Sequence, residues 1–300
     1  MFKKILLPLD GSELAEIIIP YGEELARRLG SEITLVHVRG QEHQQEYEHI
    51  HQVYLDRLAE AVTEHIRSGQ PKSKKVKVTT RVESGEPQEN ICRLVDETDV
   101  DLIIMSAVSA SGLKIGKMLG SVTDHVCRTV PIPVMLIRPQ GAQRNKGKEQ
   151  MINRILITLD GSELSKKALP VGEELASKLK AKLTLFQMAD MVRLYDDGSG
   201  SSAYVDYVEL NEDEKKRVNA GITALEKELK KKGIDVTHVV TSGYDAADDI
   251  IEVAKKTGAD LMVMSTHGRS GLRRFAFGSV AEKILRHGEI PLLLVNARAG

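Results

Sequence analysis

A glycine-rich stretch near the end of the chain carries residue types suited to holding a phosphate group. It reads Ser265-Thr266-His267-Gly268-Arg269-Ser270-Gly271, and Gly278-Ser279-Val280 then opens a segment with helical apolar spacing. Glycines let the main chain approach an anion closely, and a helix start supplies free N–H groups and the positive end of the helix dipole. The Ser279 hydroxyl adds a donor. Taken alone, a plain loop with Ser279 as an ordinary N-cap explains the stretch equally well.

A second polar turn, Asp160-Gly161-Ser162, follows the strand-like run from Ile155 to Leu159. Asp, Gly and Ser are common turn and cap residues, so a structural role alone could explain them. However, in a doubly wound sheet the order of the strands reverses at one point, and ligands bind there. The strands that end near Asp160 and Ser265 are expected to lie on either side of that point. The two polar segments would then meet in one crevice, which favours a binding site.

Both polar segments occur twice, because the chain is an internal repeat. ILLPLDGSEL at Ile5–Leu14 returns as ILITLDGSEL at Ile155–Leu164, and Gly120-Ser121-Val122 returns as Gly278-Ser279-Val280. In a chain of 300 residues, each half is long enough to bury its own core. The repeat predicts a first domain over residues 1–140, a flexible polar linker over 141–150 and a second domain over 151–300.

Short aliphatic runs alternate in each half with longer segments of helical apolar spacing, which indicates βα units around a mainly parallel sheet. Leu102–Met105 and Leu261–Met264 are apolar without alternation, so helices should cover both faces of the sheet. We therefore expect an α/β fold of two tandem, doubly wound, Rossmann-like domains with five strands each. The expected strands are 3–9, 32–39, 76–82, 101–106 and 133–138, then 153–159, 182–188, 234–241, 260–265 and 291–296.

The composition argues against several classes of partner. The 42 Lys and Arg residues nearly balance the 43 Asp and Glu residues, and Trp is absent, so we expect no nucleic-acid partner. No apolar run approaches the length that spans a membrane, so no membrane partner is expected. Two cysteines without a Cys-x-x-Cys spacing and a start without a signal-like apolar region predict a cytoplasmic protein.

The strand followed by Asp-Gly-Ser, the run from Met264 to Leu272 (MSTHGRSGL) and the Gly-Ser-Val before the last helix resemble the universal stress protein family in both halves. ATP-binding members of that family carry Gly, two residues, Gly, nine residues, Gly and then Ser or Thr. Here nine residues separate Gly268 from Gly278, and Ser279 follows, which fits the motif. Ser265 stands where the family has its first Gly, and adds a side chain where the main chain would approach the ligand.

The resemblance implies an adenine nucleotide alpha hydrolase-like fold and a site for ATP, which usually carries Mg²⁺. Gly268, Gly278 and Ser279 would hold the phosphates, and the end of the first strand of this half would border the adenosine. Met188 would pack near the adenine, although a core methionine explains it equally well. The predicted nucleotide-binding residues are Thr158, Leu159, Asp160, Met188, Ser265, His267, Gly268, Arg269, Gly278, Ser279 and Val280.

The first half departs further from the motif. Ser109 stands in place of Gly268, and the loop that leads to Gly120 is one residue longer than the loop that leads to Gly278. An added Cβ and a changed loop length should both hinder the main chain from wrapping a phosphate. We therefore expect an impaired site in the first half, although it retains Asp10, Gly120 and Ser121.

Three further features are interpreted as structural. GLKIGK at Gly112–Lys117 is one residue short of a Walker A loop, and Met118 follows where Ser or Thr is required. The three histidines of the segment after the second strand lack a repeating i, i+4 spacing and are expected on a solvated face, not at a metal; they are His43, His49 and His51. The polar, Gly- and Ser-rich segment 193–209 is expected to be mobile.

Three functions stay open. The leading hypothesis is an ATP-binding regulator in the stress response, whose occupancy changes a surface that an unidentified protein partner reads. The second is a slow ATP hydrolase, although the SGG-x-D-S and His-x-Gly-His signatures of related enzymes are missing and His267 has no obvious carboxylate partner in sequence. The third is a scaffold that binds no nucleotide.

The last strand of each half indicates how the two halves could pair. Family members commonly pair through this strand, so the resemblance implies that Ile132–Ile137 meets Ile290–Val295 within one chain and makes an intramolecular pseudo-dimer. Further pairing of two chains into a homodimer stays open.

Overall fold

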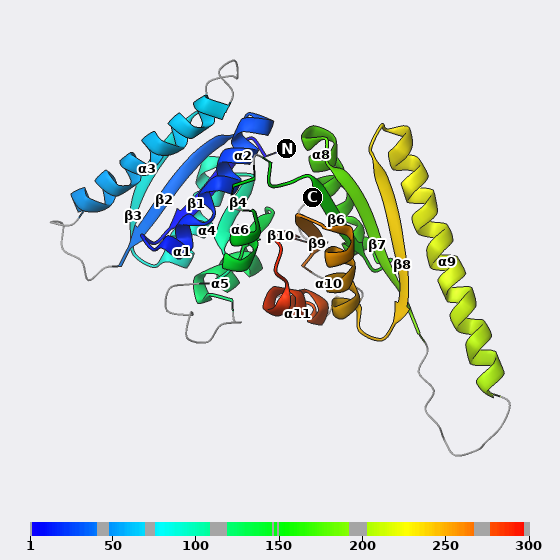
Figure 1. The fold of residues 1–300 in the computed structure, drawn as a ribbon. Coiled ribbons are helices and arrows are strands. Elements are labelled where there is room, and N and C mark those ends of the chain that lie inside the picture. The colour runs from blue at the N-terminus through cyan, green and yellow to red at the C-terminus, as the bar shows by residue number, and fades with distance from the viewer. Residues whose placement is uncertain are drawn as a thin grey trace.

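The computed structural model describes residues 2–40, 48–69, 76–108, 119–145, 147–148, 150–191, 203–266 and 277–296. In this part of the chain one sheet of 10 strands runs through the molecule in the order β3-β2-β1-β4-β5-β10-β9-β6-β7-β8 (Figure 1). The strands are β1 Lys4–Leu9, β2 Glu32–Arg39, β3 Val78–Ser84, β4 Leu102–Ser106, β5 Val134–Ile137, β6 Arg154–Leu159, β7 Lys182–Asp190, β8 Val236–Gly243, β9 Leu261–Ser265 and β10 Leu292–Val295.

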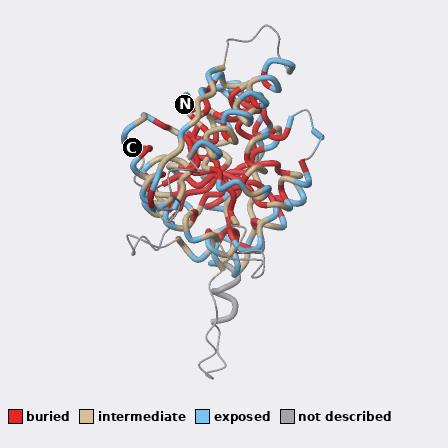
Figure 2. The backbone as a smooth tube through the Cα atoms, turned by 90° about the vertical axis from the view of Figure 1, so that its left-hand side faces the viewer, coloured by how far each residue is buried: buried red, intermediate tan, exposed pale blue. Residues whose placement is uncertain are grey.

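Helices cover both faces of the sheet, as the non-alternating apolar strands require. One buried cluster joins the strands to α2, α3, α8 and α9, and the other joins them to α4, α5, α10 and α11. Buried residues accordingly follow the middle of the molecule (Figure 2). The helices are α1 Glu13–Glu16, α2 Ile19–Leu29, α3 Glu48–Gly69, α4 Pro87–Thr98, α5 Ser121–Thr129, α6 Pro139–Asn145, α7 Glu163–Lys166, α8 Ala168–Leu179, α9 Ala203–Lys231, α10 Ala246–Thr257 and α11 Ser279–His287.

The two halves of the sheet meet at β5 and β10. Within each half all strand pairs are parallel, whereas β5 and β10 are antiparallel, with Met135 opposite Leu293. This pairing confirms the predicted pseudo-dimer within one chain. The predicted α/β architecture of two tandem doubly wound domains is also confirmed, and the strand bounds differ from the predicted ones by no more than two residues.

The connection between the domains is more ordered than the sequence predicts. Its first part forms α6, in which Asn145 is only 3% exposed and donates from Nδ2 to the Tyr21 hydroxyl at 3.0 Å. The Tyr21 hydroxyl donates to the carbonyl of Gly141 at 3.3 Å, and a Cβ on Gly141 would lie 2.7 Å from the Glu289 carbonyl oxygen. The expectation of a flexible linker is therefore wrong for this part, because tertiary hydrogen bonds stabilise a helix that lacks apolar periodicity.

Burial of Tyr21 predicts a loss of stability in alkali. Burial raises the pKa of its hydroxyl to about 12. As the pH rises above about 10, the unfolded chain loses this proton before the folded chain does, so the free energy of unfolding falls. We expect Tyr21→Phe to remove about 2 kcal/mol of the loss between pH 8 and 11.5, measured by urea unfolding. Equal losses in the variant and the wild type would contradict this.

Two other expectations change in part. His51 is half-buried and stacks on His37, with ring centroids 4.4 Å apart, so it does not lie on a fully solvated face. His49 is exposed, as expected, whereas His43 lies outside the described residues. α9 begins at Ala203, so the end of the segment expected to be mobile is helical.

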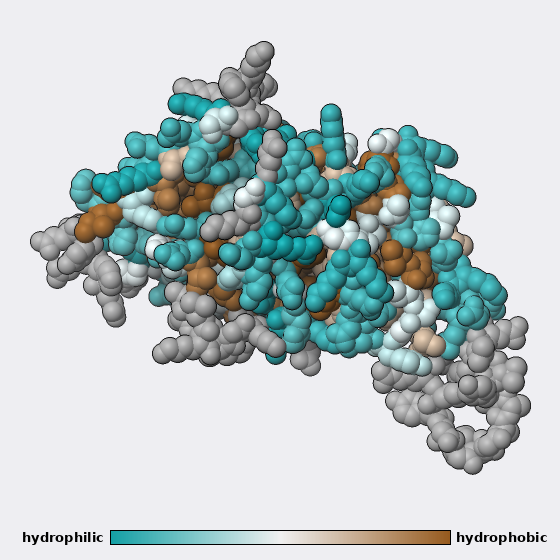
Figure 3. Space-filling view, in the orientation of Figure 1, coloured by the Kyte–Doolittle hydropathy of each residue, from teal (hydrophilic) through white to brown (hydrophobic). Residues whose placement is uncertain are grey.

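One face of the molecule shows how its polar and apolar residues are distributed. Hydrophilic residues predominate on the face shown in Figure 3, and the apolar residues there form small, separated groups. No helix in the described part of the chain is long and apolar enough to cross a lipid bilayer. A functional site on this framework is therefore sought first in its pockets.

Candidate functional site

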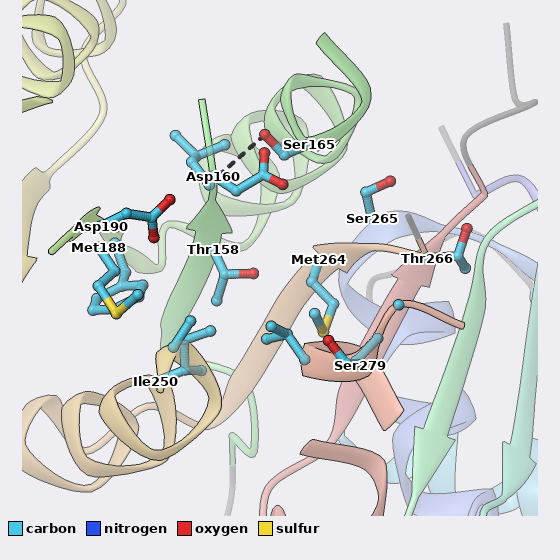
Figure 4. Close-up of a pocket in the computed structure, with 16 residues that line it drawn as sticks. Thr158, Asp160, Ser165, Met188, Asp190, Ile250, Met264, Ser265, Thr266 and Ser279 are labelled. Atoms are coloured by element: carbon cyan, nitrogen blue, oxygen red, sulfur yellow. Dashed lines mark hydrogen bonds between the residues drawn. The ribbon is translucent and has the colours of Figure 1, made fainter. Parts of the chain in front are cut away.

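A pocket of about 270 Å³ opens at the carboxyl ends of β6 and β9 in the second domain (Figure 4). β6 pairs with β9 on one side and with β7 on the other, so chain connections leave this point in opposite directions. Open α/β sheets bind their ligands at such a switch point. The pocket is lined by Thr158, Leu159, Asp160, Ser165, Phe186, Met188, Asp190, Ala246, Ile250, Met264, Ser265, Thr266, Gly278, Ser279, Val280 and Ala281.

The structure brings most of the predicted binding residues together. Those around the pocket come from three places in the chain: the end of β6, the end of β7 and the two sides of the glycine-rich loop. They are Thr158, Leu159, Asp160, Met188, Ser265, Gly278, Ser279 and Val280. The other three, His267, Gly268 and Arg269, lie outside the described residues.

The start of α11 forms one end of the pocket. Gly278 is its N-cap, with φ −61° and ψ 152°, and no side chain in the described part of the chain caps it. The Gly278 N–H donates to the Thr266 carbonyl at 3.2 Å, whereas the Gly278 carbonyl accepts from Glu282 at 2.9 Å. The first-turn N–H groups, on Ser279, Val280 and Ala281, have no partner within the helix. This end of the pocket is suited to an anionic group.

Apolar side chains, with Asp190 beside them, form the other end of the pocket. Figure 4 shows Met188 and Ile250 on the side away from Ser265 and Thr266. Met188 is 8% exposed and belongs to the buried cluster, and it also lines the pocket. Met188 is therefore a core residue and also a pocket wall, and its packing near an adenine stays a prediction. Such a wall suits the flat face of an aromatic ring.

Asp160 organises the turn after β6. Its carboxylate accepts the Ser162 N–H at 2.9 Å, and Gly161 has a φ of +81°, which a residue with a side chain rarely adopts. The N-cap of α7 is Ser162, whose hydroxyl accepts the Ser165 N–H at 3.1 Å. Asp160 thus stabilises the turn, and Ser162 caps α7. Asp160 also lines the pocket.

Several pocket residues were not predicted from the sequence. Asp190 lines the pocket from the last position of β7, and Figure 4 shows it beside Met188. The predicted strand ended at 188, so Asp190 was missed together with the extension. Ser165 and Ile250 come from helices, where an ordinary polar or apolar residue gives no sign that a pocket lies next to it. The unpredicted set is Ser165, Phe186, Asp190, Ala246, Ile250, Met264, Thr266 and Ala281.

The first domain holds the ends of its corresponding loop in the same way. The Gly120 N–H donates to the Ala107 carbonyl at 3.1 Å, as Gly278 does to Thr266. Thr123 takes the place of Ala281, is 5% exposed and donates from its hydroxyl to the Ser106 carbonyl at 2.9 Å. The first domain therefore has a larger, hydrogen-bonded side chain where the second domain has an alanine that lines the pocket, which adds to the prediction of an impaired first site.

Comparison with known proteins identifies the family of this chain. The Universal stress protein family model matches residues 1–138 and 151–296, which is nearly the whole chain. The chain belongs to the universal stress protein family. The two matches also show that it carries two universal stress protein domains in tandem.

Relatives of this universal stress protein occur with one domain or two. Universal stress protein Slr1230 of Synechocystis is 26% identical and covers 97% of this chain and 99% of its own length. Universal stress protein YxiE of Bacillus subtilis is 28% identical over 149 residues and covers 49% of this chain but 100% of itself. A crystal structure of a universal stress protein from Archaeoglobus fulgidus, 18% identical, superimposes with a TM-score of 0.71 over 100% of both chains and shows the same fold.

Proposed function

We propose that the second domain binds an adenine nucleotide, ATP in the first instance, and that the protein is a nucleotide-responsive regulator in the stress response. The observation that carries the proposal is one pocket with two different ends. The start of α11, which no described side chain caps, faces one end, and Met188 with Ile250 forms the other. A nucleotide has the same two ends, a phosphate chain and an aromatic base.

The residues around the pocket fit such a ligand. The first-turn N–H groups of α11 and the Ser279 hydroxyl would hold phosphate oxygens, and Met188 would pack on the base. Asp160 and Asp190 line the pocket and offer carboxylate oxygens to ribose hydroxyls or to a Mg²⁺ ion that accompanies the phosphates. Bound ATP would add negative charge beside the glycine-rich loop, and the resulting change of the loop would be the signal that a protein partner reads.

The proposal is tested by asking whether the purified chain carries a nucleotide. The full chain is purified without added nucleotide and denatured, and the released nucleotide is identified and quantified by chromatography. We expect about one adenine nucleotide per chain, or calorimetric binding of added ATP where the site has emptied during purification. A chain that releases no nucleotide and binds none would contradict the proposal and favour the scaffold hypothesis.

Ser265 gives the proposal a gain-of-affinity test. Its side chain is 6% exposed and lines the pocket where the family motif has Gly. Removing the side chain in Ser265→Gly should let the main chain approach the ligand, and we expect ATP to bind about three- to tenfold more tightly in calorimetry, or roughly 1 kcal/mol. Ser106→Gly, at the equivalent position of the first domain, is the control and should leave affinity unchanged. Weaker binding by Ser265→Gly would show that the hydroxyl itself is a ligand.

A further inference from the structure

An arginine of the first domain contacts a residue beside the pocket of the second domain. The Arg128 guanidinium, from α5, lies 4.5 Å from the centroid of the Phe277 ring. Phe277 directly precedes Gly278, which lines the pocket and is the N-cap of α11. A contact on Phe277 therefore acts one residue away from the proposed phosphate site.

Two hydrogen bonds orient the Arg128 guanidinium. Its Nε and Nη2 donate to the two carboxylate oxygens of Asp124, each at 2.7 Å, one helical turn earlier on α5. These hydrogen bonds also raise the pKa of Arg128, so the group stays charged. A guanidinium held in one plane can rest on an aromatic face, where the attraction between the cation and the ring adds to packing.

The repeat does not reproduce this contact between the equivalent residues, an arginine of the second domain and a ring of the first. Arg286 of α11 occupies the position of Arg128 in the repeat and forms the same kind of ion pair, to Glu282 at 2.6 Å. However, Leu119 stands at the position of Phe277 in the first domain, so Arg286 has no equivalent ring to contact. The aromatic residue is present in the domain with the proposed site and is replaced in the domain whose site is predicted to be impaired.

The first domain also lies near the far end of α11. Arg138, directly after β5, is 7% exposed and lines a small crevice together with Leu285 and Gly288. Gly288 is the C-cap of α11, and a cation near a helix C-terminus interacts favourably with the helix dipole. The first domain thus contacts the residue before the start of this helix and shares a crevice with its far end.

We propose that Arg128 is a positioning residue for the nucleotide site of the second domain, and that the first domain acts as a brace for that site. This inference rests on the proposed function. It gives a role to the first domain, whose own site is predicted to be impaired, because the segment from Phe277 into α11 is then pre-organised for the ligand by a contact from outside its own domain.

The test compares Arg128→Gln, Phe277→Leu and the double variant in the full chain, with ATP affinity measured by calorimetry. Each single variant should weaken binding about three- to tenfold, and the double variant should bind no more weakly than either single one, because both changes remove the same contact. Arg286→Gln is the matched control. It loses an i, i+4 ion pair of the same kind without losing a ring contact, so its affinity should stay within about twofold of wild type.

A second readout does not depend on nucleotide. Amide hydrogen exchange of the segment 277–280 in the nucleotide-free chain should become faster in Arg128→Gln and stay unchanged in Arg286→Gln. Unchanged exchange and unchanged ATP affinity in Arg128→Gln would overturn the brace while leaving the proposed function intact. If the wild-type chain binds no nucleotide, the proposed function fails, and the exchange rates alone decide whether Arg128 orders this segment.

Discussion

Replacing Gly278 by Val is expected to abolish nucleotide binding while leaving the fold intact. Gly278 has φ −61° and ψ 152°, a conformation that Val adopts readily, and the nearest heavy atom to an added Cβ is the Thr266 carbonyl oxygen at 3.9 Å. The added isopropyl group would stand beside the start of α11, where the phosphates would bind. We expect nucleotide released from the purified chain to fall from about one per chain to a trace, and ATP affinity to fall at least about 100-fold, or roughly 2.7 kcal/mol.

The repeat supplies the control for this experiment. Gly120 is the N-cap of α5, with φ −62° and ψ 145°, so Gly120→Val makes the same substitution in the same backbone conformation. Because the first site is predicted to be impaired, nucleotide content and affinity should not change in this variant. Equal losses in the two variants would show that both domains bind nucleotide. An unchanged Gly278→Val protein would show that the ligand does not approach the start of α11.

The strands and the place of the pocket could be predicted from the sequence, because each depends on local pattern. Runs such as Leu261–Met264 are apolar without alternation and are buried throughout, so their length and position are visible in the sequence. The switch point follows from strand order, and strand order follows from the repeat of βα units. Asp160 and Ser265 were therefore expected to come together, and they line one pocket.

The remaining features depend on contacts between distant segments. Asp190 was missed because β7 runs two residues beyond its predicted end, where β8 still provides a pairing partner at Gly243. α6 was missed because the buried hydrogen bonds of Asn145 replace the apolar periodicity that usually marks a helix. The stacking of His51 on His37 joins α3 to β2, and spacing along α3 alone carries no information about it.

The largest effect on stability is expected from Glu24→Ala. The Glu24 carboxylate is 2% exposed and accepts the backbone N–H groups of Met151 at 2.7 Å and Ile152 at 3.1 Å. It also pairs with Arg28 at 2.6 Å, and Arg28 donates onward to the carbonyls of Ile152 and Leu179. This network ties α2 of the first domain to the beginning of the second domain. Removing the carboxylate would leave two N–H groups and a largely buried cation, the 12% exposed Arg28, without their acceptor, which costs about 3–5 kcal/mol.

Comparing the calorimetric unfolding of Glu24→Ala with that of Glu174→Ala would distinguish the stability contributed by this network from the stability contributed by the local sequence. Both glutamates lie in the same pentapeptide, GEELA, at the same position of the repeat. The side chain of Glu174 is 37% exposed and pairs along its own helix with Lys178 at 2.8 Å, and an exposed i, i+4 pair of this kind is worth about 0.5 kcal/mol or less. We expect the unfolding midpoint to fall by roughly 6–15 °C for Glu24→Ala and by about 2 °C or less for Glu174→Ala. Equal shifts would mean that the Glu24 carboxylate stabilises the protein through its place in the pentapeptide, and not through the docking of the second domain onto α2.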